Sequence, residues 1–187
     1  YDNVPLPHRP KQDPHPAIWY PGNVDYAGRH RLNTIIGGPA KIIAQAIETY
    51  RSLTADPEAN WNPGVATPTI GATRHLYVTK SKQDALARIK VAYPIYHQNL
   101  AVLFKKYNVA FPTPPGDPSM GGDIDRAMMV EGLVAGSPDD VAQHIQNLIN
   151  ETSIEYLIFS FAWGDLAHDE TFASMQLFVN EVMPRFI

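Results

Sequence analysis

The sequence predicts an α/β fold with a parallel sheet, because short apolar runs alternate with helical segments along the chain. The runs are rich in aliphatic and aromatic residues, and most stop at Gly, Pro or a polar turn, as buried strands do. Right-handed crossovers would place these strands parallel, with helices outside the sheet. The four predicted strands lie at residues 17–20, 33–36, 75–78 and 155–161.

Each predicted strand is followed by a helical pattern with a recognisable start. Asn23 is a candidate N-cap, and Pro39 occupies an expected first helical position. Ser81 can cap a third helix, and Ser137 is followed by Pro and two acids that favour a helix start. A final helix is expected over about 170–183. Two stretches rich in Pro and Gly, residues 55–73 and 108–132, are predicted loops.

Four strand–helix units correspond to half of an eight-stranded (β/α)8 TIM barrel. The alternative is a small doubly wound sheet, but no GxGxxG follows any strand, which disfavours its dinucleotide-binding form. The chain has 187 residues, which is the length of one domain, and it opens at Tyr1 in a Pro-rich stretch. We therefore interpret residues 1–187 as a piece of a longer protein.

Composition excludes several classes of function. Hydrophobic residues make up 44% of the chain and the net charge is −4, which fits a globular protein without an electrostatic footprint for nucleic acid or anionic membranes. There is no Cys, so disulfides and cysteine-ligated metals are excluded and nothing argues for secretion. No apolar run is long enough to span a membrane, and the seven His residues lack metal-site spacing. A cytoplasmic protein without a metal is expected.

Ligands of parallel α/β folds bind beyond the carboxyl ends of the strands. Gly22 and Asn23 follow the first predicted strand and open a helix, which is a natural phosphate seat; a plain capped turn is the alternative. Gly37 and Gly38 follow the second strand and would let a flat ring approach closely, or would simply supply a turn.

The loop after the fourth strand carries the remaining candidates. Trp163 could stack on a ring or pack at the rim of a pocket. Asp165 and His168 could transfer protons, or could lie in a solvated loop next to the last helix. No hydrolase elbow or P-loop motif is present in the chain.

Several stretches share order and spacing with one known family. They include QDPHPAIW at 12–19, YAGRHRLNTIIGG at 26–38, VAGSPDDV at 134–141 and FVNEVMP at 178–184. On these motifs the sequence resembles the carboxyl-terminal half of luciferase-like flavin monooxygenases over nearly its whole length. The resemblance implies that the four strands are the last four of a (β/α)8 barrel, and that the first half is missing from this chain.

The resemblance also implies an activity: reduced FMN and O2 oxidise a small organic substrate. It places the flavin phosphate near Gly22 and Asn23 and the ring beside Gly37 and Gly38. The Ser common at the first of these turns is absent here, which leaves backbone donors. The implied apolar walls of the substrate pocket are Tyr20, Phe161 and Trp163.

The remaining implications concern the whole protein. The usual catalytic residue belongs to the family's first half, so His168 and Asp165 are only weak candidates here. A separate flavin reductase and a homodimer are expected partners. The alternatives are a deazaflavin-dependent dehydrogenase or reductase on the same fold, or a non-catalytic flavin-binding relative.

Overall fold

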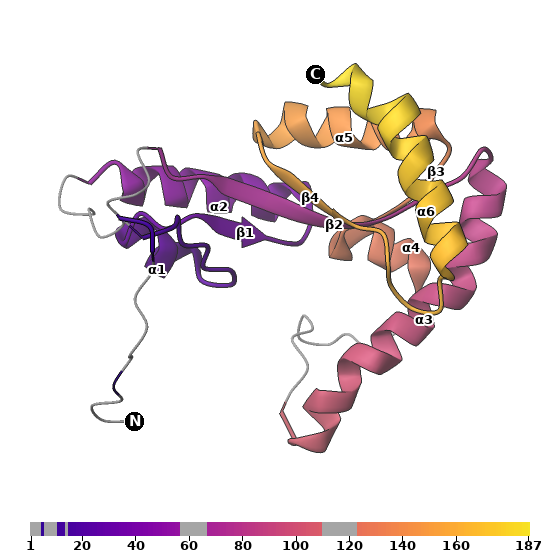
Figure 1. The fold of residues 1–187 in the computed structure, drawn as a ribbon, viewed down its shortest axis with the longest axis horizontal. Coiled ribbons are helices and arrows are strands. Elements are labelled where there is room, and N and C mark those ends of the chain that lie inside the picture. Colours follow the sequence, from indigo (N-terminus) through magenta and orange to yellow (C-terminus); the bar gives the residue numbers. More distant parts are fainter. Residues whose placement is uncertain (1–4, 6–10, 14, 57–66, 110–122) are drawn as a thin grey trace.

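A computed structural model of the chain describes residues 5, 11–13, 15–56, 67–109 and 123–187. It shows a four-stranded parallel sheet with helices packed against it (Figure 1). The elements in chain order are α1 (Val24–Arg29), β1 (Thr34–Ile36), α2 (Ala40–Thr54), β2 (Ile70–Val78), α3 (Lys82–Lys106), α4 (Ile124–Arg126), a π turn (Ala127–Glu131), β3 (Leu133–Gly136), α5 (Pro138–Thr152), β4 (Leu157–Ser160), α6 (His168–Leu177), a second π turn (Phe178–Val182) and a 3-10 turn (Met183–Arg185).

The four predicted strands are parallel and adjacent in chain order, as expected. Trp19 forms a single parallel bridge to Asn33, so the first predicted strand is reduced to one bridge. β1 pairs with the start of β2, and β4 pairs with its middle, where Thr73 lies opposite Ile158. The fold is therefore α/β with a parallel sheet.

Two features of the sheet were not predicted. β2 begins at Ile70, five residues before the expected start, because its first residues pair with β1. β3 is an additional short strand that pairs with the end of β2, from His75 opposite Leu133. The predicted loop over 108–132 lies partly outside the described residues, but residues 124–131 form α4 and a π turn instead of a loop.

β1 and β3 follow one another along the same edge of β2. The backbone N–H of Thr34 donates to Thr69 O, and that of His75 donates to Gly132 O. By contrast, the N–H of Ala72 donates to Tyr156 O, next to β4. Because backbone groups of alternate residues point to opposite edges of a strand, β4 occupies the other edge. β2 is thus the central strand, and it extends well beyond the end of β1.

The two faces of the sheet are covered differently. On one face, which we call the covered face, side chains of β2 pack against α2, α5 and the second π turn; they are Ile70, Ala72, Leu76 and Val78. On the opposite face Tyr77 packs against Ala85 and Ile89 of α3. α3 therefore lies on the opposite face of the sheet from α2 and α5.

The remainder of that opposite face is only half-buried. We call it the open face; it carries Ile35, Thr73, His75, Ile158 and Ser160, which alternate with residues of the covered face. At its amino-terminal end Trp19 and Tyr156 stack with ring centres 5.1 Å apart, and they are 37% and 41% exposed. α3 leaves the end of β2 and runs toward the lower edge of the view in Figure 1, away from α5 and α6.

The helix starts largely follow the predicted caps. Asn23 Oδ1 accepts a hydrogen bond from the N–H of Tyr26, and Ser137 forms a capping box with Asp140. Pro39 is the N-cap of α2, one residue before the predicted position. Within the described parts of the chain, no helix combines the length and hydrophobicity that a membrane crossing needs.

Candidate functional site

The carboxyl ends of the strands form a stepped edge. β1 ends opposite Ala72, β4 ends opposite His75, and β2 continues to Val78. The turns that follow these strands carry the predicted site residues. Because β1 ends opposite Ala72 and β3 begins opposite His75, Thr73 and Arg74 have no strand neighbour on that edge of β2.

The Gly22–Asn23 turn adopts the geometry expected of a capped turn. Gly22 has φ +98°, and a Cβ at this position would meet nothing within 4 Å. Asn23 caps α1, which has six residues. Asp25 places a carboxylate in the same first turn, paired with Arg29 at 2.8 Å. That carboxylate disfavours a second anion at the start of α1.

The Gly37–Gly38 turn leads into a better anion seat. Gly38 has φ +105°, a conformation that favours glycine, and it precedes the 15-residue helix α2. The first turn of α2 contains no acidic residue, and no side chain caps it. A Cβ on Gly37 would lie 3.8 Å from Thr73 Cγ2, so the turn also borders the open face. The structure therefore places Gly37 and Gly38 beside both β2 and a free helix start.

Tyr20, Phe161 and Trp163 do not come together. Tyr20 stacks on Tyr26 with ring centres 4.8 Å apart, at the start of α1. Phe161 contacts Phe178 at 5.6 Å and belongs to the covered face, because it continues the alternation of β4. The chain then turns, and Trp163 is buried against α3 on the opposite face.

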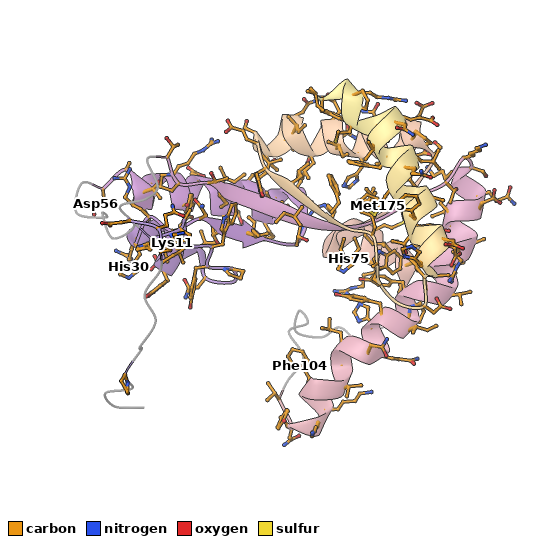
Figure 2. The ribbon with its side chains drawn as sticks, in the orientation of Figure 1. Lys11, His30, Asp56, His75, Phe104 and Met175 are labelled. Carbon is orange, nitrogen blue, oxygen red and sulfur yellow. The ribbon has the colours of Figure 1, made fainter. Side chains whose placement is uncertain are left out.

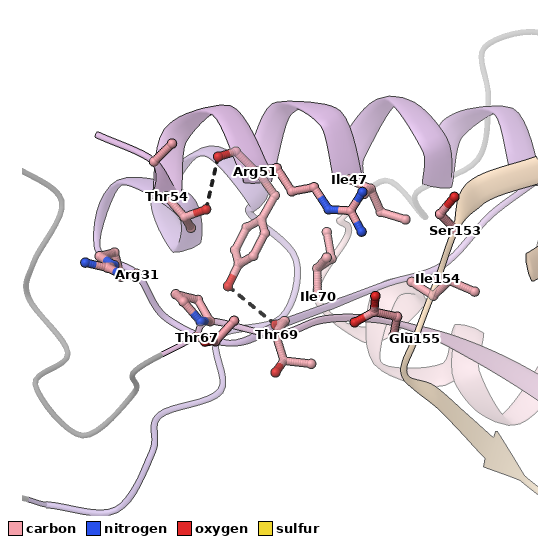
Figure 3. A pocket seen from close by; sticks show the side chains of 13 residues that line it. Arg31, Ile47, Arg51, Thr54, Thr67, Thr69, Ile70, Ser153, Ile154 and Glu155 are labelled. Atoms are coloured by element: carbon pink, nitrogen blue, oxygen red, sulfur yellow. Dashed lines mark hydrogen bonds between the residues drawn. The ribbon is translucent and has the colours of Figure 1, made fainter. Parts of the chain in front are cut away.

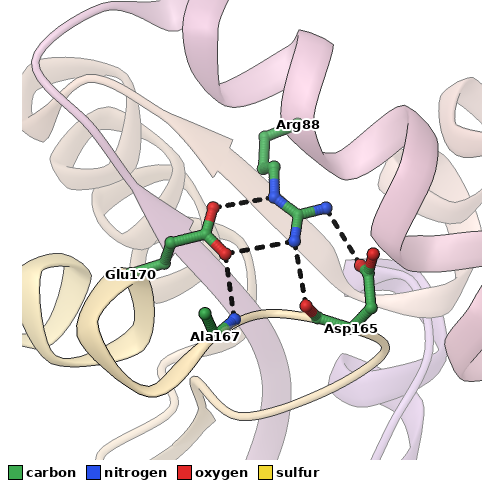
Figure 4. A network of polar contacts seen from close by, with 4 residues as sticks. All are labelled: Arg88, Asp165, Ala167 and Glu170. Carbon is green, nitrogen blue, oxygen red and sulfur yellow. Dashed lines mark hydrogen bonds and ion pairs between the residues drawn. The ribbon is translucent and has the colours of Figure 1, made fainter.

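Asp165 is held in an ion-pair network (Figure 4). Arg88 of α3 donates to Asp165 Oδ1 at 2.9 Å and to its carbonyl oxygen at 3.0 Å. It also donates to both carboxylate oxygens of Glu170, and this contact lowers the pKa of Glu170. Arg88 thus engages both the side chain and the backbone carbonyl of Asp165, and these contacts favour a structural role for Asp165.

His168 is the first residue of α6 and is exposed. Its ring stacks on that of Phe172, with centres 6.3 Å apart and planes 18° apart. No contact of His168 with the aromatic residues of the open face is seen in the described part of the chain. Its position therefore gives no geometric support to a catalytic role.

An aromatic cluster around His75 was missed by the sequence analysis. The ring of His75 lies 4.5 Å from that of Tyr96 and 6.1 Å from that of Trp163. Tyr93 completes the cluster, 6.0 Å from Trp163. Figure 2 places His75 near the centre of the molecule, whereas Phe104 marks the far end of α3. Strand alternation could have put His75 on the face of Thr73, but its partners come from distant segments.

Trp163 is buried in this cluster, with 6% of its surface exposed. Its Nε1 is buried and has no hydrogen-bond partner among the described residues. A buried N–H without a partner is costly, and such a group is available to a ligand oxygen. The cluster therefore combines aromatic rings with a buried donor, Trp163 Nε1, that has no partner among the described residues.

The pocket of Figure 3 lies at the opposite end of the sheet. Its volume is about 510 Å³, and its lining includes Thr69 and Ile70 at the start of β2 and Glu155 just before β4. Tyr50 donates to Leu32 O at 2.5 Å beside it, and burial raises the pKa of this phenol. Catalytic sites of parallel barrels lie at the carboxyl ends, so we do not assign the active site to this pocket.

Comparison with known proteins supports the fold. No family model matches the sequence. The uncharacterised protein y4wF of Sinorhizobium fredii is 28% identical over 191 residues, which cover 98% of this chain and 53% of that protein.

No group of three or more potential metal ligands occurs in the described ranges.

Three solved structures are similar to the chain. Monooxygenase RslO1 from Streptomyces bottropensis matches with a TM-score of 0.68 and 18% identity, over 97% of this chain and 51% of the other. The oxygenating constituent of 3,6-diketocamphane monooxygenase from Pseudomonas putida, in complex with FMN, has a TM-score of 0.64 and 16% identity, over 92% and 50%. The coenzyme F420-dependent tetrahydromethanopterin reductase from Methanopyrus kandleri has a TM-score of 0.56 and 14% identity, over 90% and 50%.

The chain thus spans about half the length of each of these proteins. At such low identity the likeness concerns the fold. This chain has the fold of about half of a bacterial luciferase-like flavin monooxygenase.

Proposed function

We propose that the protein is a flavin-dependent monooxygenase that uses reduced FMN and O2 to oxidise a small organic substrate. The observation that carries this proposal is the structural similarity to monooxygenases over nearly the whole chain. The chain would contribute the last four strand–helix units of a (β/α)8 barrel. The aromatic cluster at the carboxyl end of the open face supports the proposal, since barrel enzymes react at that end.

The flavin ring would lie on the open face, beside Gly37 and Gly38. Small side chains leave room for a flat ring there: Thr73 and Ser160 lie on this face, and Gly37 lacks a side chain. The Gly22–Asn23 turn would bind the phosphate through backbone N–H groups, although Asp25 works against an anion at that helix start. The open face and the Gly37–Gly38 turn therefore suit a flat ring, whereas Asp25 makes the Gly22–Asn23 turn a poorer phosphate seat.

Reduced FMN would supply the electrons for oxygen activation once it is bound. The residues of this chain would exclude water and orient the substrate. Tyr93, Tyr96 and Trp163 form a buried or half-buried aromatic wall around His75, which keeps the site apolar. Trp163 Nε1 would donate a hydrogen bond to a substrate oxygen. Of the predicted pocket residues, Trp163 fits this role, whereas Tyr20 and Phe161 lie elsewhere.

The proposal extends to the whole protein in three respects. The general acid or base would come from outside this chain, because Asp165 is tied to Arg88 and His168 faces solvent. A separate flavin reductase would deliver reduced FMN. The whole protein would be a cytoplasmic homodimer.

A deazaflavin-dependent reductase or dehydrogenase is the second candidate. The similarity to the F420-dependent reductase from Methanopyrus kandleri, over 90% of this chain and 50% of that protein, supports it. Such an enzyme would transfer a hydride and would not need O2. The residues of the open face are compatible with either ring system, since both are flat tricyclic rings.

Cofactor titration separates the two candidates. In the first experiment, FMN and a deazaflavin are titrated into the protein and binding is followed by fluorescence. In the second, reduced FMN is supplied under 18O2 together with panels of small ketones, alkanes and aromatic compounds. Incorporation of 18O into a product, detected by mass spectrometry, supports the monooxygenase. Selective deazaflavin binding with hydride transfer supports the second candidate. A protein that binds neither cofactor contradicts both and fits a relative without flavin chemistry.

A further inference from the structure

A second pocket, of about 190 Å³, lies on the covered face beside the start of α2. It is bordered by Gly38 at the turn after β1, by Arg74 of β2 and by His144 of α5. Arg74 lies beyond the end of β1, which pairs only as far as Ala72. The pocket therefore opens beside Arg74, between the end of β1 and the start of β3, where β2 has no strand neighbour on that edge.

Arg74 is buried, and no counter-ion for it is found among the described residues. Only 3% of its surface is exposed, and one terminal N–H donates to Thr73 O at 2.9 Å. Its Nε has no partner among the described residues, and burial lowers the pKa of the guanidinium. Arginine nonetheless stays protonated in proteins, so a buried positive charge is left uncompensated. Such a charge is costly unless an anion pairs with it.

The backbone around Arg74 is shaped to hold the guanidinium. Gly132 has φ +81°, and a Cβ there would lie 3.1 Å from both Cδ and the bonded terminal nitrogen of Arg74. Glycine at this position therefore leaves the space that the side chain occupies. The conformation of Arg74 is fixed by its surroundings, which is a requirement for a preorganised binding group.

Two further donors line the same pocket. His144 Nε2 is buried and has no partner in the described part of the chain. The first turn of α2 begins at this pocket, with Pro39 and Ala40 in its lining, and it has neither an acidic residue nor a side-chain cap. Free N–H groups and the helix dipole at such a start attract negative charge.

We propose that this pocket binds a phosphate group through Arg74, His144 Nε2 and the first backbone N–H groups of α2. Arginine and a helix start are a common combination for phosphate. The site does not depend on the proposed flavin ring position, because Arg74 and His75 are consecutive residues of a strand and point to opposite faces. The phosphate can belong to inorganic phosphate or to a phosphorylated small molecule such as FMN.

Glu151 also lines the pocket and is exposed. Its carboxylate would repel a bound phosphate. Alternatively it could swing inward and serve as the counter-ion of Arg74. The two roles predict opposite effects of Glu151→Gln, so this variant discriminates between them.

Calorimetric titration with inorganic phosphate, in the absence of flavin, tests the site. We expect Arg74→Met to weaken phosphate binding about tenfold or more, because a charge-assisted contact is lost. His144→Gln should weaken it less, and Glu151→Gln should tighten it. The control Arg51→Met removes an exposed arginine of α2 and should leave the affinity unchanged.

Thermal unfolding without phosphate shows whether a variant that binds phosphate weakly is still correctly folded. Arg74→Met removes an uncompensated buried charge, so this variant should unfold at the same temperature as the wild type or higher. Equal phosphate affinities of wild type and Arg74→Met would overturn the proposal. A Glu151→Gln variant that is less stable and binds phosphate no better would also overturn it, since Glu151 would then be the counter-ion.

Competition identifies the source of the phosphate. If FMN displaces inorganic phosphate from the wild type and riboflavin does not, the pocket holds the phosphate of the flavin. If neither displaces it, the pocket serves a separate anion. Both results support the site. The titration with inorganic phosphate uses no flavin, so its outcome does not depend on whether the protein has flavin-dependent oxidation activity.

Discussion

Arg88 Nε lies 2.8 Å from Oε1 of Glu170, and a second nitrogen of the same guanidinium lies 3.1 Å from Oε2. These two parallel hydrogen bonds join α3 to the first turn of α6. Arg88 also holds Asp165, and Glu170 accepts the N–H of Ala167. Arg88 thus anchors to α3 the loop that holds Trp163 next to His75.

Arg88→Met should lower the free energy of unfolding by about 1–2 kcal/mol, because a bidentate, partly exposed network is lost. Urea denaturation measures this change. Arg29→Met is the matched control: its ion pair with Asp25 is exposed on both sides, and its loss should lower the free energy of unfolding much less than Arg88→Met does. Equal effects of the two variants would show that the network does not stabilise the loop.

Gly164 sits where the same loop meets the backbone of α3. It has φ +64°, and a Cβ would fall on the carbonyl oxygen of Ala92, with the carbonyl carbon 2.9 Å away. Gly164→Ala should therefore destabilise the protein by about 2–4 kcal/mol, through strain and backbone displacement. Gly22 also has a positive φ, but a Cβ there would meet nothing within 4 Å, so Gly22→Ala should lower the free energy of unfolding by only about 1 kcal/mol. Thermal unfolding of both variants isolates the steric clash.

His144 should make stability depend on pH. Burial, and then the charge of Arg74, lower its pKa from 6.5 to about 4. Between these values the unfolded chain binds a proton that the folded protein does not, so stability is full above about pH 6.5 and falls as the pH drops toward 4. The loss is roughly 2–3 kcal/mol. His144→Gln should flatten this part of the curve, measured by urea denaturation between pH 4 and 7; an unchanged slope would contradict the assignment.

Local patterns predicted most of the sheet but little of the site. β4 was found because its apolar run is uninterrupted, whereas Gly71 and flanking polar residues hid the first part of β2. The helix that follows Ser81 was predicted, but a helix start does not tell which face of a sheet the helix covers. Phe161 and Trp163 were both expected to line the substrate pocket, but the turn between them sends them to opposite faces of the sheet. The contact of Arg88 with Glu170 joins distant segments, and no local pattern indicates it.

The proposed phosphate seat at Gly22 and Asn23 can be tested with two nearly isosteric variants. Gly22→Asp should weaken FMN binding by roughly 2–3 kcal/mol if the phosphate lies there, because a carboxylate would face a dianion. Gly22→Asn carries the same backbone strain without the charge, and asparagine tolerates positive φ. If both variants bind FMN equally in a fluorescence titration, the phosphate does not lie at this turn. The pocket at Arg74 would then be the next place to examine.

The last prediction concerns the 187-residue chain expressed by itself. Its open face leaves Trp19 and Tyr156 more than a third exposed, and every residue of β4 is only half-buried. Each aliphatic side chain that is fully buried contributes about 1.5–3 kcal/mol, while whole domains are stable by only about 5–15 kcal/mol. Ile35 and Ile158 would gain from a cover on this face, whereas Ile18 packs with α2 on the covered face.

The cover can be the remainder of a barrel or a second copy of the chain. Exposed sheet surface and free strand edges favour association. We therefore expect residues 1–187 alone to dimerise or aggregate, and to lack flavin-dependent oxidation. Light scattering gives the mass in solution, and calorimetry shows whether unfolding is cooperative. A monomer that unfolds cooperatively and turns over substrate would show that the open face needs no cover, and would assign the whole catalytic site to these residues.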